Sequence, residues 1–215
     1  LGDDFARAYE VTYTGTDGAS HHPYATSWGA SSRLVGGVIM THGDRAGLQL
    51  PPAVAPHQVV VVPIQATDGD VGAAAAALAA SLHDAGIRVH VDDRDYLRRG
   101  AKFFEWELKG VPVRIELGSR DLAAGAVTVV RRDDATKDQV PLAGVSTRAA
   151  ELLGDVQAAL FDRARSFREE NTAQIASRDE LIAFLREGRG FAVTAWCGAE
   201  ACEAAVKEET SATIR

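Results

Sequence analysis

The sequence is poor in cysteine, in long apolar runs and in excess positive charge. Two cysteines in 215 residues are too few for a disulfide framework and indicate a reducing compartment. The longest apolar stretch, Val71–Ala80, is rich in alanine and falls short of the ~20 residues that a membrane span needs. Residues 1–15 lack the apolar centre of a secretory signal. We therefore expect a cytoplasmic protein with no membrane partner.

The net charge of −7 argues against a general nucleic-acid binder, and DNA is not expected as a partner. The average hides a local difference. Between Arg88 and Arg132, ten basic and seven acidic side chains give +3, whereas the remainder of the chain carries −10. Extending the window to Asp134 leaves only +1, so the contrast is small.

Length and periodicity predict one to two domains of the α/β class, built on a mixed sheet with helices on its faces. The valine run 58–64 is too apolar for a one-sided strand and indicates one that is covered on both faces. Prolines at 51, 52 and 56 predict an extended linker over residues 45–57. The other expected strands are 9–13, 22–28, 87–91, 111–117, 126–131, 139–142 and 191–196, and the expected helices are 34–42, 71–85, 101–109, 147–171, 178–186 and 201–210.

The segment Ser27–Arg33 is the most unusual local sequence, because the expected end of a strand is followed by a capped helix start that carries an arginine. Gly29 allows a ligand close to the backbone, and a helix N-terminus favours anions. Arg33 in the first turn can hold phosphate oxygens with its planar fork of donors. The plainer interpretation is a helix capped by Ser31 or Ser32 with one solvated arginine.

Distinctive blocks of sequence follow one another along the chain, namely Ser27–Arg33, Ile39–Asp44, Gly47–Pro52, Val54–Pro56, Gln58–Ile64, Asp92–Arg94, Lys102–Gly118, Cys197–Cys202 and Lys207–Thr210. Taken together, these blocks resemble the prolyl-tRNA synthetases of the archaeal/eukaryotic-like type, which are class IIa enzymes. The resemblance covers essentially the whole chain, and residues 119–190 are its least distinctive part.

The resemblance implies three parts. Residues 1–50 would be the C-terminal part of a class II antiparallel-sheet catalytic domain, with motif 3. Residues 51–145 would be an anticodon-binding domain, and 146–215 an incomplete α+β C-terminal domain of the zinc type. Such enzymes use ATP and Mg²⁺ to form prolyl-adenylate and then ligate proline to the 3′ end of tRNA(Pro). The intact enzyme is expected to be a homodimer.

The family's roles map onto individual residues of this chain. Arg33 would grip the ATP γ-phosphate, with Ser31 at the small hydroxyl position near ATP. Ser27, Trp28 and Gly29 would line the proline and adenylate pocket. This suits adenylate formation, in which the protein mainly positions groups and neutralises charge.

The family's anticodon-facing segments correspond to the parts of this sequence that contain Lys102, Glu105 and Arg114. Arginine and lysine can bond guanine O6 and N7, and carboxylates accept from base amino groups. Proline codons begin with two cytosines, so the anticodon of tRNA(Pro) ends in two guanines. Each of these three charges could equally be solvated at a sheet edge. Phe103, Phe104 and Trp106 are expected in the helix core rather than as stacking platforms.

Cys197 and Cys202 have a weak zinc spacing on their own, because a structural site needs four ligands. Two small buried residues are the plainer interpretation. In the family this pair is half of a Cys₄ site whose second pair comes later. The site is therefore incomplete here, and all six histidines fall in the first 90 residues.

Other functions remain open at this point. One is a non-catalytic tRNA-binding fragment, and another is the anticodon-binding domain of a threonyl, glycyl or histidyl enzyme. A nucleotide-binding α/β domain is disfavoured, because residues 66–70 lack both the Rossmann and the P-loop glycine spacings.

Motifs 1 and 2, the adenine-clamping arginine and the main proline-binding residues would precede residue 1. We therefore expect the 215-residue chain alone to show no proline-dependent ATP–pyrophosphate exchange. The measurement is label exchange from pyrophosphate into ATP with and without proline. Exchange that depends on proline would contradict this expectation.

Overall fold

The computed structural model describes residues 2–64, 69–188 and 190–213 and divides the chain into two compact units. The first unit ends at Met40 and the second begins at Thr41. The segment 66–70, which the sequence analysis uses to argue against a phosphate loop, falls mostly outside the described residues.

The first unit contains little regular structure. Its elements are helix α1 (Asp4–Ala8), the two-residue strands β1 (Tyr13–Thr14) and β2 (Ser20–His21), and most of helix α2 (Arg33–His42). The predicted hairpin is confirmed in shorter form, with Tyr13 opposite His21. The Asp17 carboxylate stabilises its turn by accepting hydrogen bonds from the Ala19 N–H and the His21 ring. The second strand expected over residues 22–28 is not formed.

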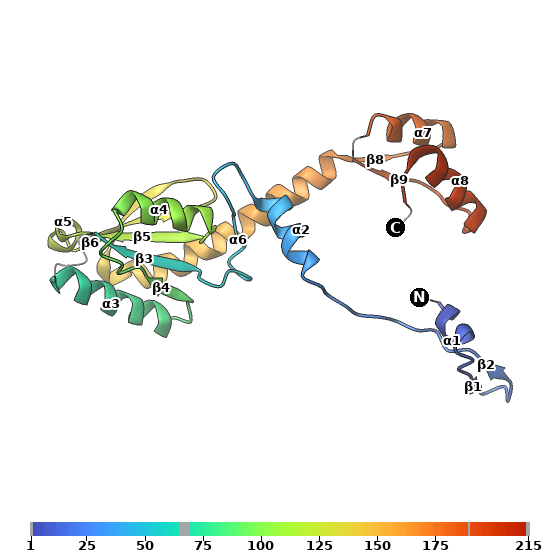
Figure 1. Ribbon diagram of the computed structural model, residues 1–215, viewed down its shortest axis with the longest axis horizontal. Helices are drawn as coiled ribbons and strands as arrows, with labels where there is room; N and C mark the ends of the chain where they lie inside the picture. The colour runs from blue at the N-terminus through green and yellow to red at the C-terminus, as the bar shows by residue number, and fades with distance from the viewer. Residues whose placement is uncertain (1, 65–68, 189, 214–215) are drawn as a thin grey trace. The chain divides into compact units, whose positions relative to one another are not determined.

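The second unit is built on a five-stranded mixed sheet with the order β4-β3-β5-β6-β7, which confirms the predicted α/β class (Figure 1). Strands β4, β3 and β5 run parallel, and β6 and β7 continue antiparallel. The elements are β3 (Val59–Pro63), α3 (Gly69–Asp84), β4 (Val89–Val91), α4 (Arg99–Leu108), β5 (Val113–Leu117), α5 (Ser119–Ala123), β6 (Ala126–Arg131), β7 (Lys137–Pro141), the 3₁₀ turn η1 (Leu142–Gly144) and α6 (Val145–Glu170).

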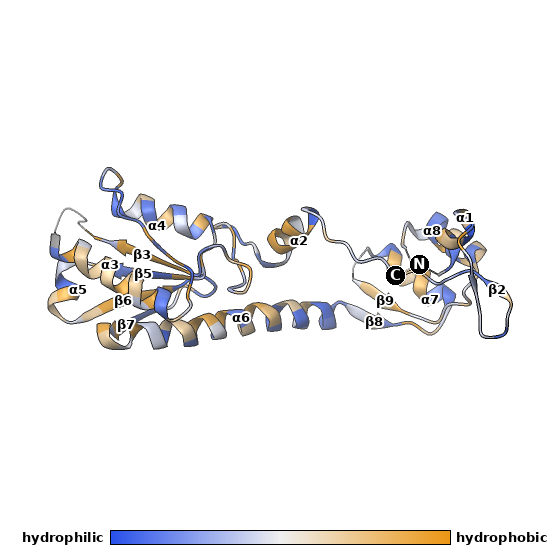
Figure 2. Cartoon of the chain, turned by 90° about the horizontal axis from the view of Figure 1, so that it is seen from below, coloured by the Kyte–Doolittle hydropathy of each residue, from blue (hydrophilic) through white to orange (hydrophobic). Residues whose placement is uncertain are grey.

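Two cores lie on opposite faces of this sheet. Every residue of β3 is buried, which confirms the prediction of a strand covered on both sides. Val59 and Val61 pack with α3 and the first half of α6, whereas Val60 and Val62 pack with Trp106 of α4. Figure 2 shows the apolar colouring concentrated in the strands, while α6 becomes hydrophilic toward its C-terminal end.

Helix α4 covers its face of the sheet only in part. The helix packs on β3, and among the described residues the side chains of β6 and β7 on this face are polar or exposed, apart from Val130 and the half-buried Ala126. Thr128 lies opposite Gln139, and the Gln139 amide donates to the Thr128 hydroxyl at 2.7 Å. The outer strands therefore present an open polar face beside α4.

After α6 come strand β8 (Thr172–Gln174), helix α7 (Arg178–Arg186), strand β9 (Phe191–Val193) and helix α8 (Glu200–Thr210). Strands β8 and β9 pair in parallel. The predicted boundaries of α7 are confirmed, with the Ser177 hydroxyl accepting from the Glu180 N–H as its cap. Arg178 of α7 pairs with Glu209 of α8 at 2.6 Å. No helix in the described part of the chain is long and apolar enough to span a bilayer.

The linker that follows α2 packs on the sheet unit instead of extending into solvent. The Leu48 N–H donates to the Leu108 carbonyl at 3.0 Å, and the Leu50 N–H donates to the Gly110 carbonyl at 3.1 Å. We call residues 44–50 the strap. Two glycines make this approach possible, because a Cβ on Gly47 or on Gly110 would lie 2.6 Å from the backbone of the other segment.

Gly110 combines this close approach with a φ of +72°, whereas Gly125 has a φ of +66° and open space around it. We expect Gly125→Ala to lower the free energy of unfolding by about 1 kcal/mol through backbone strain alone. Gly110→Ala should cost about 2 kcal/mol more, because the strap must move away. Urea unfolding followed by circular dichroism measures both, and equal losses would contradict the packing described for the strap.

Candidate nucleic-acid interface

A buried carboxylate stands at the end of β4. Asp92 is 1% exposed and accepts two hydrogen bonds from the Arg94 guanidinium, at 2.8 and 2.7 Å. The Trp106 indole of α4 donates to the same carboxylate at 2.8 Å. Lys102, 3% exposed, donates from Nζ to the Asp92 carbonyl at 2.9 Å and lies 3.8 Å from the carboxylate. Asp92 thereby joins β4 to two residues of α4.

Burial by itself raises the pKa of Asp92. The hydrogen bonds from Arg94 and Trp106 and the charge of Lys102 outweigh burial, and they hold the pKa well below its ordinary value. The carboxylate is therefore ionised at neutral pH, and it holds α4 through a hydrogen bond from Trp106 and the charge of Lys102.

Phe103 and Glu105 of helix α4 contact different neighbours. Glu105 pairs with Lys109 at 2.6 Å and with Arg94 at 2.8 Å, and these two cations lower its pKa, Lys109 most. The Phe103 ring packs against the core that contains Val60 and Trp106, and it also contacts a guanidinium. That guanidinium belongs to Arg114 of β5 and lies 4.3 Å from the ring centroid.

The Arg114 side chain is held along one edge. Its Nε and Nη2 both donate to one oxygen of Glu116, at 3.1 and 3.0 Å. The opposite edge, formed by Nη1 and the second N–H of Nη2, has no partner in the described part of the chain. A planar fork with two parallel donors is the geometry that bonds guanine O6 and N7 together.

A cavity of about 180 Å³ opens beside Arg114. One cation in its wall, Lys137 of β7, is exposed and has no ion pair among the described residues. The register places Arg114 opposite Val130, and Val130 opposite Lys137, so the two cations share one row across three strands. The lining residues are Val60, Trp106, Glu107, Val111, Arg114, Val130, Arg131, Arg132, Ala135 and Lys137.

The three residues expected at the anticodon do not have equivalent positions. The Arg114 guanidinium contacts Phe103, whereas Glu105 pairs with Arg94 and Lys109 instead. The Glu105 and Arg114 side chains are 31% and 14% exposed. Lys102 is on the inner side of α4, bonded to Asp92. Asp92, Glu107 and Lys137 were not predicted as site residues from the sequence. Asp92 lies in the block Asp92–Arg94, but no local pattern shows that this acid is buried while the next one, Asp93, is exposed.

The aromatic residues of α4 follow the expectation in part. Trp106 is buried and Phe103 is half-buried, as predicted for the helix core. Phe104 is 64% exposed, so the prediction is wrong for this ring, which points away from the sheet.

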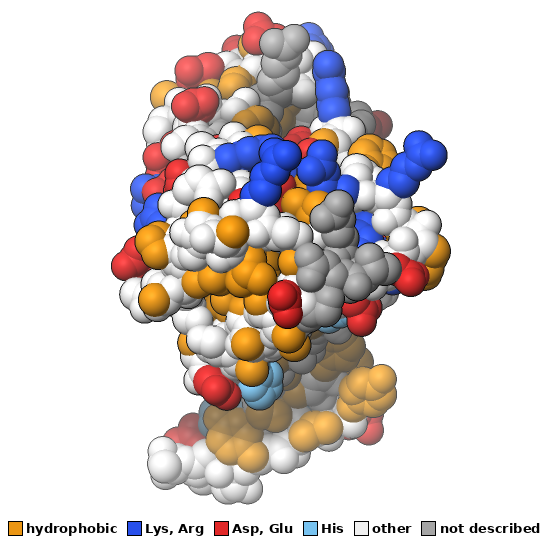
Figure 3. Space-filling view, turned by 90° about the vertical axis from the view of Figure 1, so that its left-hand side faces the viewer, with side chains coloured by type: hydrophobic (Ala, Val, Ile, Leu, Met, Phe, Trp, Pro, Cys, Tyr) orange, Lys and Arg blue, Asp and Glu red, His pale blue; other side chains and the backbone are white. Residues whose placement is uncertain are grey.

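Figure 3 looks onto the end of the sheet where α5 lies, and Lys and Arg side chains gather there next to an apolar patch.

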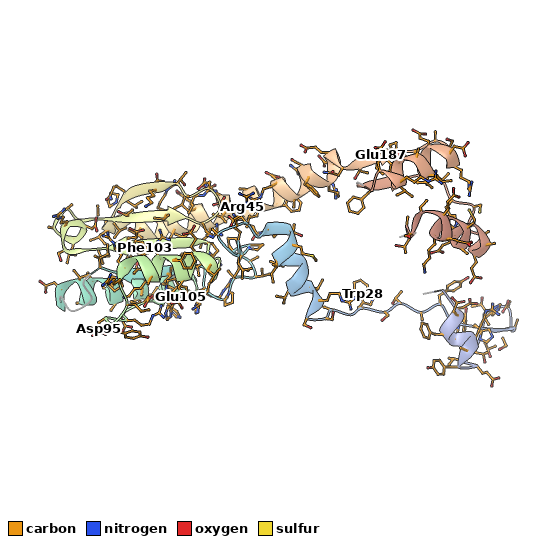
Figure 4. The ribbon with its side chains drawn as sticks, turned by 45° about the horizontal axis from the view of Figure 1, so that its top comes forward. Trp28, Arg45, Asp95, Phe103, Glu105 and Glu187 are labelled. Atoms are coloured by element: carbon orange, nitrogen blue, oxygen red, sulfur yellow. The ribbon has the colours of Figure 1, made fainter. Side chains whose placement is uncertain are left out.

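The residues expected at motif 3 lie in the first unit, apart from the end of α2. Ser27, Trp28 and Gly29 form no helix or strand, and Trp28 is 93% exposed (Figure 4). Arg33 is the first residue of α2 and is exposed. The Ser31 hydroxyl accepts from the Arg33 N–H at 3.4 Å, which agrees with a capping role.

Cys197 and Cys202 are both free and exposed, so the interpretation as two buried residues is wrong. The Ala199 N–H and then the Cys202 thiol stabilise the Cys197 thiolate and lower its pKa, while Cys197 raises the pKa of Cys202. The described residues contain no group of three or more His, Cys, Asp or Glu that could hold a metal ion. Two thiols do not complete a four-ligand zinc site, so no role is assigned to zinc.

Two family models match the chain. "Anticodon binding domain" covers residues 58–152, and "Prolyl-tRNA synthetase, C-terminal" covers residues 178–215. Over 215 residues, which is the whole chain, it is 47% identical to "Proline--tRNA ligase 2" of Clostridioides difficile. The chain therefore belongs to the prolyl-tRNA synthetase family. A second relative, the proline–tRNA ligase of Frankia casuarinae, is 50% identical over 196 residues, which cover 91% of this chain.

The solved structures agree. Prolyl-tRNA synthetase of Cryptosporidium parvum with L-proline and AMP superposes with a TM-score of 0.85 at 33% identity, over 98% of this chain and 46% of that one. The same enzyme with halofuginone and AMPPNP gives 0.84 at 34% identity, over 98% and 44%. The chain spans about half the length of its relatives: 45% of the Clostridioides protein and 41% of the Frankia protein. It matches their C-terminal portion with the anticodon-binding domain, and the threonyl, glycyl and histidyl alternatives are not favoured.

The Asp92 cluster predicts a pH-dependent loss of stability. Asp92→Asn should lower the free energy of unfolding by about 3 kcal/mol at pH 7, because Lys102 and Arg94 lose a buried counter-charge. The native pKa of Asp92 is depressed, so its contribution is present above the unfolded pKa of about 4 and is lost as pH falls below it. The difference between wild type and variant should therefore shrink on acidification.

Urea titrations at pH 7 and at pH values below 4 measure this difference. Asp93→Asn is the matched control, because Asp93 is the exposed neighbour and should change stability by less than about 0.5 kcal/mol. A difference between Asp92→Asn and wild type that stays constant with pH would contradict the assignment.

Proposed function

We propose that this chain supplies the anticodon-reading part of a proline–tRNA ligase, and that the open sheet face beside α4 binds the anticodon of tRNA(Pro). The observation that carries the proposal is the unfilled fork of Arg114, stacked on Phe103 at the edge of a cavity in the domain that matches the anticodon-binding model. Sequence-specific RNA readers take unstacked loop bases in this way.

In this proposal Arg114 bonds the O6 and N7 atoms of one anticodon guanine. Glu116 holds the guanidinium side-on, so little side-chain entropy is lost when the base arrives. Glu105 accepts from a base amino group at the neighbouring position. Lys102 acts indirectly, since its Nζ is bonded to Asp92 and its side chain is 4% exposed.

The catalytic assignments complete the proposal for the whole enzyme. Arg33 would hold the ATP γ-phosphate at the start of α2, with Ser31 near ATP and Ser27, Trp28 and Gly29 at the proline and adenylate pocket. The full-length protein would ligate proline to tRNA(Pro) through prolyl-adenylate, with ATP and Mg²⁺, as a cytoplasmic homodimer. Support comes from relatives named proline–tRNA ligase and from the Cryptosporidium complexes with proline and AMP.

The test replaces the reading fork. Arg114→Ala should weaken binding of tRNA(Pro) by about 5- to 150-fold, because one bidentate contact to a base is worth 1 to 3 kcal/mol. A tRNA(Pro) transcript with both anticodon guanines replaced should lose much less. Filter binding or fluorescence anisotropy at one fixed salt concentration measures both affinities.

Arg148→Ala is the matched control. Arg148 also pairs with carboxylates, but it lies on α6, on the other side of the sheet. It should change neither affinity beyond about two-fold. Equal loss of both RNAs in Arg114→Ala would assign Arg114 to the RNA backbone or to the fold, and would contradict base reading.

A further inference from the structure

Arg132 lines the same cavity as Arg114 but has its donors arranged in the opposite way. Its Nη1 and Nη2 donate to the two oxygens of Asp44, at 2.9 and 2.7 Å, and its Nε donates to the Glu107 carbonyl at 2.9 Å. The end-on edge of the guanidinium is therefore filled by a carboxylate. No pair of parallel N–H groups is left to bond a guanine or a phosphate.

Arg114 and Arg132 differ in which edge of the guanidinium is bonded to a carboxylate. Glu116 takes the side-on edge of Arg114 and leaves its end-on fork free, whereas Asp44 takes the end-on fork of Arg132. Arg131 is the third arginine of the lining, and by the alternation of β6 its side chain lies on the same face of the sheet as Val129. There it pairs with Asp133, and Asp155 of α6 adds a further negative charge. The described cavity thus offers one guanidinium fork, from Arg114.

Asp44 is itself fixed from several directions. Besides Arg132, its carboxylate accepts from the Gln49 amide at 2.6 Å and from the Ala46 and Gly47 N–H groups at 2.8 and 3.1 Å. Arg132 most of all, and then Gln49, keep the pKa of Asp44 well below its ordinary value. Gln49 is 5% exposed and accepts in turn from Arg163 of α6. The carboxylate is thus charged and held facing Arg132.

We infer that Asp44 is a specificity-determining residue of the cavity, because it occupies the Arg132 fork and leaves Arg114 as the group that reads RNA. The inference rests on the proposed function, but it concerns a residue outside the matched anticodon-binding segment of 58–152. A second free fork would bind any phosphate or guanine within reach, since arginine favours both. Asp44 therefore suppresses sequence-independent affinity at this site.

The test uses the full chain with Asp44→Asn. The Asn carbonyl can still accept from the Ala46 and Gly47 N–H groups, so the turn is retained. Its amide N–H₂ replaces the carboxylate oxygen that accepts hydrogen bonds from Arg132 Nη1 and from the Gln49 amide. An N–H donor of the asparagine then faces the N–H donors of both neighbours. Binding is measured for tRNA(Pro) and for the transcript with both anticodon guanines replaced, each over a series of salt concentrations.

Wild type should prefer tRNA(Pro). In Asp44→Asn the affinity for the altered transcript should rise, so that the preference falls about five-fold or more. The plot of log affinity against log salt should steepen by ~0.7 to 0.9, the value for one added phosphate contact. The double variant Asp44→Asn/Arg132→Gln should return the slope to the wild-type value, because the freed fork is gone.

Asp133→Asn is the matched control, because it releases Arg131 on the other face of the sheet and should change neither slope nor preference. An unchanged preference and slope in a folded Asp44→Asn protein would overturn the inference, and so would a double variant that keeps the steeper slope. Folding is checked by circular dichroism.

Two further outcomes separate the inference from the proposed function. A wild-type chain without preference for tRNA(Pro) would overturn the proposed function, while the slope change in Asp44→Asn would still test release of Arg132. If Asp44→Asn does not fold, the single variant Arg132→Gln tests the inference. It should leave the slope unchanged, and a slope lower by ~0.7 to 0.9 would show that Arg132 already contacts a phosphate, which overturns the inference.

Discussion

The open face of the sheet depends on the buried carboxylate of Asp92. This one side chain joins the end of β4 to the indole of Trp106 and to the Arg94 guanidinium, and the main-chain carbonyl of Asp92 accepts a hydrogen bond from Lys102. Helix α4 is thereby fixed at two points of its length against the sheet. Phe103 and Glu105 lie between Lys102 and Trp106 along the helix. The positions of the Phe103 ring, which contacts Arg114, and of the Glu105 carboxylate therefore depend on Asp92.

Local pairing explains how a chain of net charge −7 can carry the RNA-binding face that we propose. The arginines around the cavity carry their own carboxylates, so the site has little excess charge and a fixed set of donors. Such pairs contribute less to long-range attraction than free cations do, because each positive charge is largely cancelled nearby. Their contribution is orientation. Which edge of a guanidinium the carboxylate takes decides whether the arginine can read a base or only supports the wall.

The sequence predicted the parts of the fold that local pattern controls. The valine run of β3, the glycine-ended helices and the capped helix α7 all follow from periodicity and turn chemistry, and the motif blocks indicated the family. It did not predict that Lys102 is buried, since a lysine among charged neighbours on a helix is usually solvated. The ion pair of Asp44 with Arg132 joins residues 88 positions apart, and no local pattern signals it. Short elements such as α5 and β8 were missed for a similar reason, because tertiary packing defines them.

The strap shows why the functional unit is larger than the segment that the family model matches. Residues 44–50 precede that segment, yet they bond to α4, to the end of β6 and, through Gln49, to α6. The Gly47 and Gly110 contacts bring two backbones together with no side chain between them, so the strap cannot shift without disturbing the turn after α4. That turn is followed by β5, which carries Arg114. Asp44, the second residue after α2, therefore holds Arg132 in the wall of the cavity. The shape of that wall is set partly by a residue that precedes the matched segment 58–152.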